Sequence, residues 1–131
     1  MGNEGTKVEA PSNPIREKAL AFAARIVQMC RLLRRRRVEE ALLSQVLRSG
    51  TSIVANVAEA QGAVSRADFR CKMQIAYKEV LETEIWLDLL VRVNSLSAAE
   101  FASIREDCSE VARLLTAITR RAALPASNDD L

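Results

Sequence analysis

The sequence predicts an all-α protein whose fold is an antiparallel up-down-up-down four-helix bundle. Apolar residues recur at alternating spacings of three and four along most of the chain, which is the spacing that places side chains on one face of a helix. The pattern divides into four segments of about 21 to 29 residues with short connections, and helices joined in this way pack in alternating directions. We therefore expect the bundle over residues 13–122, with residues 1–12 and 123–131 as disordered tails.

The first two helices are expected at about residues 14–36 and 38–61. Asn13 is placed to cap the first helix, with a proline at its first position, and Gly62 suits the end of the second. We place a break near residues 35–39, because one unbroken helix of about 48 residues would be too long for a small domain. The predicted core residues are Ile15, Ala19, Phe22, Ile26, Met29 and Leu33 in the first helix, and Leu43, Val46, Leu47, Gly50, Ile53, Val54 and Val57 in the second.

The third and fourth helices have the clearest predicted starts. Residues 64–69 and 96–101 share one pattern, namely an apolar residue, a serine, an acidic residue three positions after the serine, and a phenylalanine. In such a pattern the serine caps a free backbone N–H, the acid bonds back to the start of the helix, and the two apolar side chains contact each other as a hydrophobic staple. We therefore expect helices that begin after Ser65 and after Ser97.

The composition argues against most classes of enzyme. The sequence contains no histidine, which removes the commonest general base and the commonest neutral metal ligand. Cys30, Cys71 and Cys108 are odd in number and show no C-x-x-C spacing, so they are expected to be reduced, buried thiols and not disulfides or zinc ligands. The sequence therefore predicts a protein that is not an enzyme and that uses no cofactor and no metal.

The charge and hydropathy patterns predict a cytoplasmic protein without a membrane partner. The chain has 19 basic and 17 acidic residues and a net charge of +2, so its overall charge indicates no partner. The longest uncharged run, residues 49–58, is shorter than the roughly 20 residues that a membrane-spanning helix needs. The N-terminus also lacks the apolar segment of a secretory signal.

The second and third helices carry more apolar surface than one bundle core needs. Residues 41–58 contain a single basic residue, Arg48, and a helix that is apolar on all sides is expected to be buried on all sides. We therefore expect a homo-oligomer in which these helices face another copy of the chain. The alternative is a monomer with wide apolar stripes. The predicted interface residues are Ile75, Ile85, Trp86 and Leu89.

A stripe of polar residues follows one face of the second helix, and the third helix carries a matching set. The stripe in the second helix consists of Arg48, Ser52, Asn56 and Glu59, and the set in the third of Lys78, Glu79, Glu82 and Thr83. In an antiparallel pair Arg48 would lie opposite Glu79 or Glu82, and such a network would fix helix register or subunit geometry. A ferritin-like metal site is the alternative, but that site combines glutamate with histidine.

Most of the positive charge lies in the first helix and at its end. Residues 14–37 hold eight basic residues and one acidic residue. Arginines at a helix C-terminus suit the helix dipole and can be no more than a solvated end, whereas the functional interpretation is a surface that binds nucleic-acid phosphates. The candidate nucleic-acid-binding residues are Arg31, Arg34, Arg35, Arg36 and Arg37, with Arg120 and Arg121 at the opposite end of the bundle.

Three stretches give the chain a family resemblance. They are residues 45–60 (QVLRSGTSIVANVAEA), 65–69 (SRADF) and 76–87 (AYKEVLETEIWL). Together they resemble the four-helix-bundle proteins of the 23S rRNA intervening-sequence family, over about residues 18–118. The resemblance implies a small bacterial protein that forms a ring-like homopentamer and has no enzymatic activity. Some members are encoded inside insertions in 23S rRNA genes, and related accessory proteins of diversity-generating retroelements bind nucleic acid and a reverse transcriptase.

The favoured interpretation is a non-enzymatic, homo-oligomeric scaffold, expected to be pentameric, that binds RNA, DNA or a nucleic-acid-processing protein through its arginine-rich helix ends. A second interpretation is a structural scaffold that binds only proteins. A third takes residues 43–64 as a helix-turn-helix with its turn at Gly50, which would make the protein a DNA-binding regulator. A continuous helix through Gly50 would exclude the third.

Overall fold

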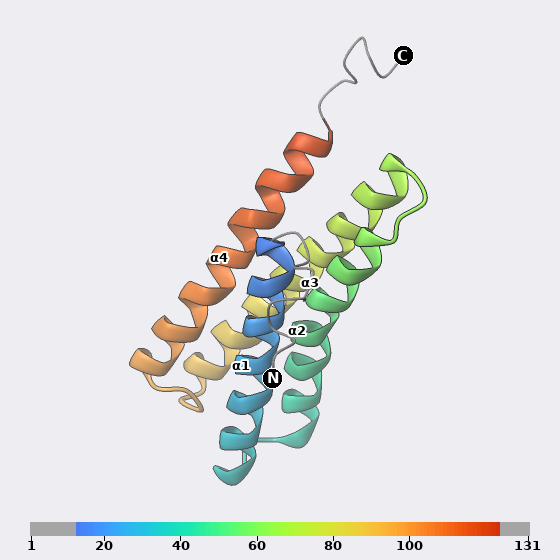
Figure 1. Ribbon diagram of the computed structural model, residues 1–131. Coiled ribbons are helices and arrows are strands. Elements are labelled where there is room, and N and C mark those ends of the chain that lie inside the picture. The colour runs from blue at the N-terminus through green and yellow to red at the C-terminus, as the bar shows by residue number, and fades with distance from the viewer. Residues whose placement is uncertain (1–12, 124–131) are drawn as a thin grey trace, which may run out of the picture.

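The structure, a computed structural model, describes residues 13–123, which form four α-helices (Figure 1). These are α1 (Pro14–Arg35), α2 (Glu40–Gln61), α3 (Arg66–Arg92) and α4 (Ala98–Ala122). Successive helices run in opposite directions (Figure 1), and no strand occurs between residues 13 and 123. The predicted all-α four-helix fold is confirmed. The predicted tails, residues 1–12 and nearly all of 123–131, lie outside the described residues.

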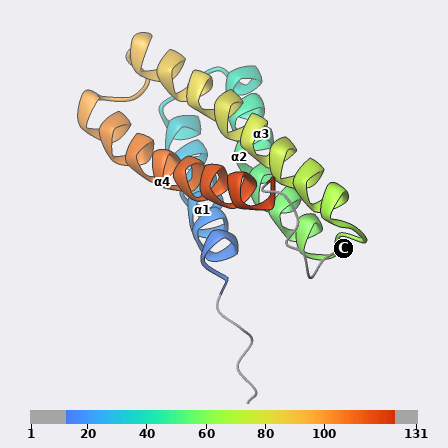
Figure 2. The same ribbon diagram turned by 90° about the horizontal axis from the view of Figure 1, so that it is seen from above.

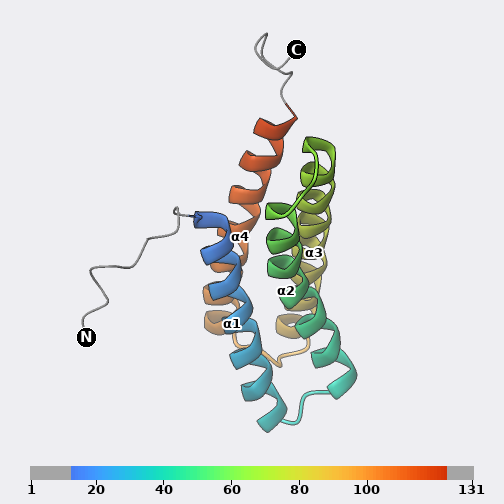
Figure 3. The same cartoon turned by 45° about the vertical axis from the view of Figure 1, so that its right-hand side comes forward.

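The helices contact one another in a closed ring. Helix α2 contacts α1 and α3, and α4 contacts α3 and α1. The contact between α2 and α3 is the largest and that between α1 and α4 the smallest. Figure 3 shows α1 and α4 on one side and α2 and α3 on the other, and from above α4 crosses α1 (Figure 2). None of the described helices is long and apolar enough to cross a membrane.

The bundle core consists largely of the residues that the periodicity predicted. All six predicted core residues of α1 are buried, and so are five of the seven in α2, while Leu47 and Val54 are half-buried. Cys30 and Cys108 are buried, as expected. Cys71 is exposed, so its predicted burial is wrong. It lies on the face of α3 that points away from the core, where the three-four spacing places no core residue.

Helices α1 and α2 approach each other closely at Gly50. A Cβ atom at this position would lie 3.0 Å from both Cγ1 and Cγ2 of Ile26, so the two helices approach as closely as they do only because residue 50 has no side chain. Helix α2 continues without interruption from Glu40 to Gln61 through Gly50. The helix-turn-helix interpretation is therefore wrong.

The caps of α3 and α4 follow the predicted pattern to different degrees. At α4 the capping box is complete, because Ser97 Oγ accepts from the Glu100 N–H at 3.1 Å and Glu100 Oε1 accepts from the Ser97 N–H at 2.9 Å. At α3, Ser65 Oγ accepts from the Asp68 N–H at 3.0 Å, but Asp68 accepts from the N–H of Val64, one residue earlier than in a capping box. Val64 is 93% exposed, so the predicted staple at this helix is wrong.

The break between α1 and α2 is a Schellman motif, in which a left-handed residue ends the helix. Arg37 has φ 63°, and this turns the chain so that Val38 N–H donates to Leu33 O at 3.0 Å and Arg37 N–H donates to Arg34 O at 3.0 Å. Glycine usually occupies the left-handed position, which explains why no clear signal for the break is present in the sequence. The same motif, with Asn94 at φ 66°, ends α3.

Candidate functional site

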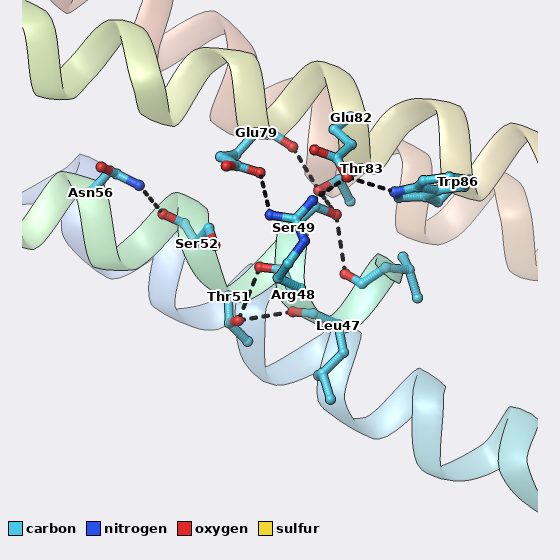
Figure 4. Close-up of polar contacts among 11 residues, drawn as sticks. Leu47, Arg48, Ser49, Thr51, Ser52, Asn56, Glu79, Glu82, Thr83 and Trp86 are labelled. Carbon is cyan, nitrogen blue, oxygen red and sulfur yellow. Dashed lines mark hydrogen bonds and ion pairs between the residues drawn. The ribbon is translucent and has the colours of Figure 1, made fainter. Parts of the chain in front are cut away.

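A polar network joins α2 to α3 on the side of the bundle (Figure 4). Arg48 forms ion pairs with Glu79, at 3.4 Å, and with Glu82. Trp86 Nε1 donates to the same Glu82 carboxylate at 3.1 Å. These hydrogen bonds from Arg48 and Trp86 hold the pKa of Glu82 below its ordinary value. The predicted cross-helix pairing of Arg48 is confirmed, but its side chain is 48% exposed, so the network lies at the surface and not in the core.

A second link between the two helices is buried directly beneath this network. Thr83 Oγ1 and Ser49 Oγ are 2.9 Å apart, and both residues are fully buried. Thr83 Oγ1 also donates to Glu79 O at 2.8 Å, within α3. The sequence predicted Thr83 as part of the polar set but missed Ser49, because Ser49 lies beside Arg48 in the chain and on the core-facing side of α2.

The other members of the predicted stripe do not join this network. Asn56 donates to Ser52 O at 2.8 Å, inside α2. Glu59 pairs with Lys72 at 3.1 Å, nearer the start of α3, and Lys78 is exposed. The described residues contain no cluster of acids and cysteines that could hold a metal ion. The stripe therefore connects α2 to α3 at both of its ends, through Arg48 with Glu79 and Glu82 and through Glu59 with Lys72, and both contacts fix the register of the two helices.

Helix α3 displays a row of apolar side chains to solvent. We call this row the α3 ridge. It consists of Tyr77, Leu81, Ile85, Leu89 and Val93, which are exposed and spaced four residues apart. Residues four apart lie next to one another along a helix, so the ridge is continuous along most of α3. Of the predicted interface residues, Ile85 and Leu89 belong to this ridge. Ile75 is exposed but lies off the row, and Trp86 is half-buried and turned toward Glu82.

The arginine run at the end of α1 separates into paired and unpaired side chains. Arg34 pairs with Glu40 at 2.9 Å, and Arg36 makes two hydrogen bonds to Glu100, at 2.9 and 2.7 Å. These bonds from Arg36 are the main reason why the pKa of Glu100 falls to about 2. Among the described residues, the exposed Arg31, Arg35 and Arg37 form no ion pair and remain available to a partner. The paired arginines connect α1 to the start of α2 and of α4.

The opposite end of the bundle carries a second group of unpaired arginines. Arg120 and Arg121 lie in the last turn of α4. The first turns of the neighbouring α3 add Arg66 and Arg70, which the sequence did not single out. Residues 13–123 provide no acid within ion-pair distance of any of these four. Arg66 and Arg70 could have been found by aligning α3 and α4 as an antiparallel pair. In that alignment, which the ion pair between Arg105 and Glu84 at 3.1 Å defines, the start of α3 lies beside the end of α4.

Together these features define the protein as a small four-helix bundle in which a polar network joins α2 and α3, and in which basic residues occupy both ends. Within that class, the chain belongs to the family of 23S rRNA-intervening sequence proteins, whose model matches residues 12–117. This match covers all of α1, α2 and α3 and most of α4. The resemblance found in the sequence motifs is confirmed.

A protein of unknown function from the S23 ribosomal protein family of Bacteroides thetaiotaomicron has a similar crystal structure. The two chains are 45% identical, the match covers 80% of this chain and 97% of the other, and the TM-score is 0.78. The shared fold therefore includes nearly the whole of that protein. No curated protein matches this chain.

Proposed function

We propose that the protein is a non-enzymatic, homo-oligomeric scaffold that binds nucleic acid through the arginine-rich ends of its bundle. The observation that supports this most directly is the distribution of unpaired charge. Within residues 13–123, ten basic side chains have no acidic partner within 4 Å, whereas ten of the 13 acidic residues are engaged in ion pairs. The unpaired basic residues are Arg16, Arg31, Arg35, Arg37, Arg66, Arg70, Lys78, Arg92, Arg120 and Arg121.

The unpaired basic residues are grouped at the ends of the bundle, and this grouping favours a polyanion as the ligand over separate small anions. Arg31, Arg35, Arg37 and Arg92 lie at the end where α1 and α3 finish, and all but one of the others lie at the opposite end. The three acids without an ion pair, Glu17, Glu39 and Asp68, also lie near helix starts at these ends, but the unpaired basic side chains outnumber them at both ends. A phosphate backbone binds such surfaces by releasing its counterions, whatever its base sequence.

Oligomerisation would repeat both basic ends. The α3 ridge is the surface that supports it, since Ile85 at its centre is 56% exposed, and a continuous exposed apolar row is typical of an interaction site. We propose a second copy of the chain as its partner, in a ring that the family resemblance suggests is pentameric. Several copies of a weak phosphate-binding surface on one particle would act together and raise the overall affinity.

The test of nucleic-acid binding is a salt titration. The purified protein is mixed with single-stranded DNA, duplex DNA and structured RNA, and the binding constant is followed against salt concentration. Replacing Arg31, Arg35 and Arg37 together by glutamine should reduce the slope of log K against log salt by about 0.9 for each phosphate that these arginines neutralise in the wild type. Arg113→Gln is the control, because Arg113 is exposed on α4 and is paired with Glu106. A wild-type protein that binds none of the three at physiological salt would contradict the proposal and favour a scaffold that binds only proteins.

The test of oligomerisation is the mass in solution. Ile85→Glu places a charge in the middle of the α3 ridge, and we expect light scattering to give the mass of the monomer, 14.5 kDa, where the wild type gives a multiple of it. Val64→Glu is the matched control, because Val64 is an equally apolar and still more exposed residue in the loop before α3. Equal masses for the wild type and Ile85→Glu would refute the α3 ridge as the subunit interface.

A further inference from the structure

We infer that the groove between the start of α3 and the end of α4 binds a phosphate group of an unpaired nucleotide, with the base against Tyr77. This inference rests on the proposed function and assigns a specific site within it. The groove has a volume of about 360 Å³ and is lined by Gln74, Tyr77, Thr116, Thr119 and Arg120. Figure 3 shows the last turns of α4 beside the first turns of α3 at this end of the bundle.

The lining has the chemistry of an anion site. Each of the five side chains carries at least one N–H or O–H donor, and none carries a carboxylate. Arg120 contributes a positive charge and has no ion pair among the described residues. A phosphate group presents several acceptor oxygens in different directions, and guanidinium and hydroxyl groups are its usual partners. A groove with many donors, one cation and no acid therefore suits phosphate better than it suits a basic or apolar ligand.

Two buried donors at this end of the bundle have no partner. Thr119 Oγ1 and Arg70 Nε are inaccessible to solvent and make no hydrogen bond within residues 13–123. Thr119 lines the groove, and Arg70 lies one helical turn before Gln74, on the same face of α3. Buried polar atoms in proteins are nearly always hydrogen-bonded. Because both atoms are closed to solvent in the unliganded protein, a phosphate in the groove becomes their acceptor when the Thr119 and Arg70 side chains turn toward it.

Tyr77 indicates which phosphate compound the groove would bind. Its ring forms part of the groove wall and is 36% exposed, so a flat group attached to the phosphate can lie against it. Bases stack on aromatic side chains only where they are not paired in a duplex. The groove therefore favours nucleotides in single strands, loops or ends, and this preference distinguishes it from the arginines at the other end of the bundle, where no exposed aromatic residue lies nearby among the residues that the structure describes.

The experiment compares glycerol phosphate with thymidine monophosphate, since both are phosphate monoesters and only the second has a base. Each is titrated into the isotope-labelled wild-type protein at constant ionic strength, and the Nε–Hε resonances of the arginines are followed by NMR. We expect both compounds to shift the Arg70 signal saturably, with thymidine monophosphate binding more tightly. Tyr77→Leu should remove that difference and leave the affinity for glycerol phosphate unchanged.

Two substitutions separate a shaped site from general charge attraction. Thr119→Val keeps the shape and the charge but removes the unpartnered hydroxyl, and we expect the affinity for thymidine monophosphate to fall about tenfold, the usual effect of losing a hydrogen bond to a charged group. Because this buried hydroxyl has no partner in the unliganded protein, the variant should be at least as stable as the wild type. Arg25→Gln removes one charge from α1, which does not line the groove, where Arg25 is paired with Asp107 at 2.7 Å, and this variant should bind as the wild type does.

The outcomes separate this inference from the proposed function. If a short oligothymidylate binds but Thr119→Val and Arg70→Gln bind it as tightly as the wild type, the groove is not the site, although the nucleic-acid scaffold stands. If glycerol phosphate and thymidine monophosphate bind equally, the assignment to a nucleotide is wrong. If all exposed arginine signals shift together, the attraction is unspecific and the inference fails. If no oligonucleotide binds at all, the proposed function itself is refuted.

Discussion

The close approach of α1 and α2 at Gly50 gives a prediction whose size follows from the structure. Alanine stabilises a helix interior by about 1 kcal/mol relative to glycine, so Gly50→Ala would be expected to stabilise α2 if the position were exposed. The new Cβ atom would, however, lie 3.0 Å from Cγ1 and Cγ2 of the fully buried Ile26 and 3.3 Å from its Cβ. No rotation of Ile26 about its χ1 angle moves both Cγ atoms away, so the helices must separate.

The expected net effect is a loss of stability. Extra methyl groups in a packed core destabilise a protein by about 1–3 kcal/mol, which exceeds the gain in helix propensity. We therefore expect Gly50→Ala to lower the free energy of unfolding by about 1 kcal/mol. Urea unfolding followed by circular dichroism measures this, at one fixed protomer concentration because the stability of an oligomer depends on concentration.

Two substitutions of Ile26 test whether the contact with its Cγ atoms causes this loss of stability. Ile26→Ala removes both Cγ atoms, so in that background Gly50→Ala should become stabilising by about 1 kcal/mol, through helix propensity alone. Ile26→Val keeps both Cγ atoms and removes only Cδ1, so in that background Gly50→Ala should remain destabilising. If Gly50→Ala stabilises the wild type, or has the same sign in all three backgrounds, the argument from the close contact is refuted.

Three further predictions concern single side chains. Thr83→Val removes the cross-helix partner of Ser49 Oγ in the core, while Ser49 Oγ still donates to Val46 O. The change should therefore cost about 0.5–1.5 kcal/mol in the free energy of unfolding, and Ser49→Ala should cost less in that background than in the wild type. Because the Glu100 pKa is lowered from 4.5 to about 2 by folding, the stability that this carboxylate contributes is complete above about pH 4.5 and is lost as the pH falls toward 2. Urea unfolding across that range should therefore show a weaker pH dependence in Glu100→Gln than in the wild type. A thiol reagent at pH 8 should label Cys71 alone in the folded protein, since burial raises the pKa of the other two cysteines to about 11 and about 12, and rapid labelling of all three would contradict this.

The helices could be predicted from the sequence because each of them depends on local chemistry. The spacing of apolar residues defines the core face, and the serine-acid patterns define the starts of α3 and α4. The end of α1 could not be located in this way, because it depends on Arg37 in a left-handed conformation that glycine usually adopts. The exposure of Val64 likewise depends on how a short loop turns and not on its sequence pattern.

The functional surfaces were less predictable because they depend on which helices lie next to each other. The sequence presents four adjacent arginines as one cationic patch, but Glu40 and Glu100 come from other helices and pair with two of them. The groove beside Arg120 could not be seen at all, since its two walls are about 40 residues apart in the chain and meet only through the register of α3 against α4. The pairing of Arg48 with Glu79 and Glu82 could be found because residues of opposite charge stand at matching positions of the two predicted antiparallel helices.

Tyr77 connects the subunit interface to the phosphate groove, because it belongs both to the α3 ridge and to the groove wall. A second copy of the chain that covers the ridge comes into contact with one side of the groove, so subunit association and phosphate binding share a free energy of coupling. Coupling of this kind is reciprocal. For each bound site, the factor by which thymidine monophosphate changes the association constant of the wild-type subunits must equal the ratio of its affinities for the oligomer and for the Ile85→Glu monomer. Light scattering with and without the nucleotide gives the first quantity, and calorimetry gives the second. Equal affinity for both forms would mean that the subunits meet on a surface that excludes Tyr77.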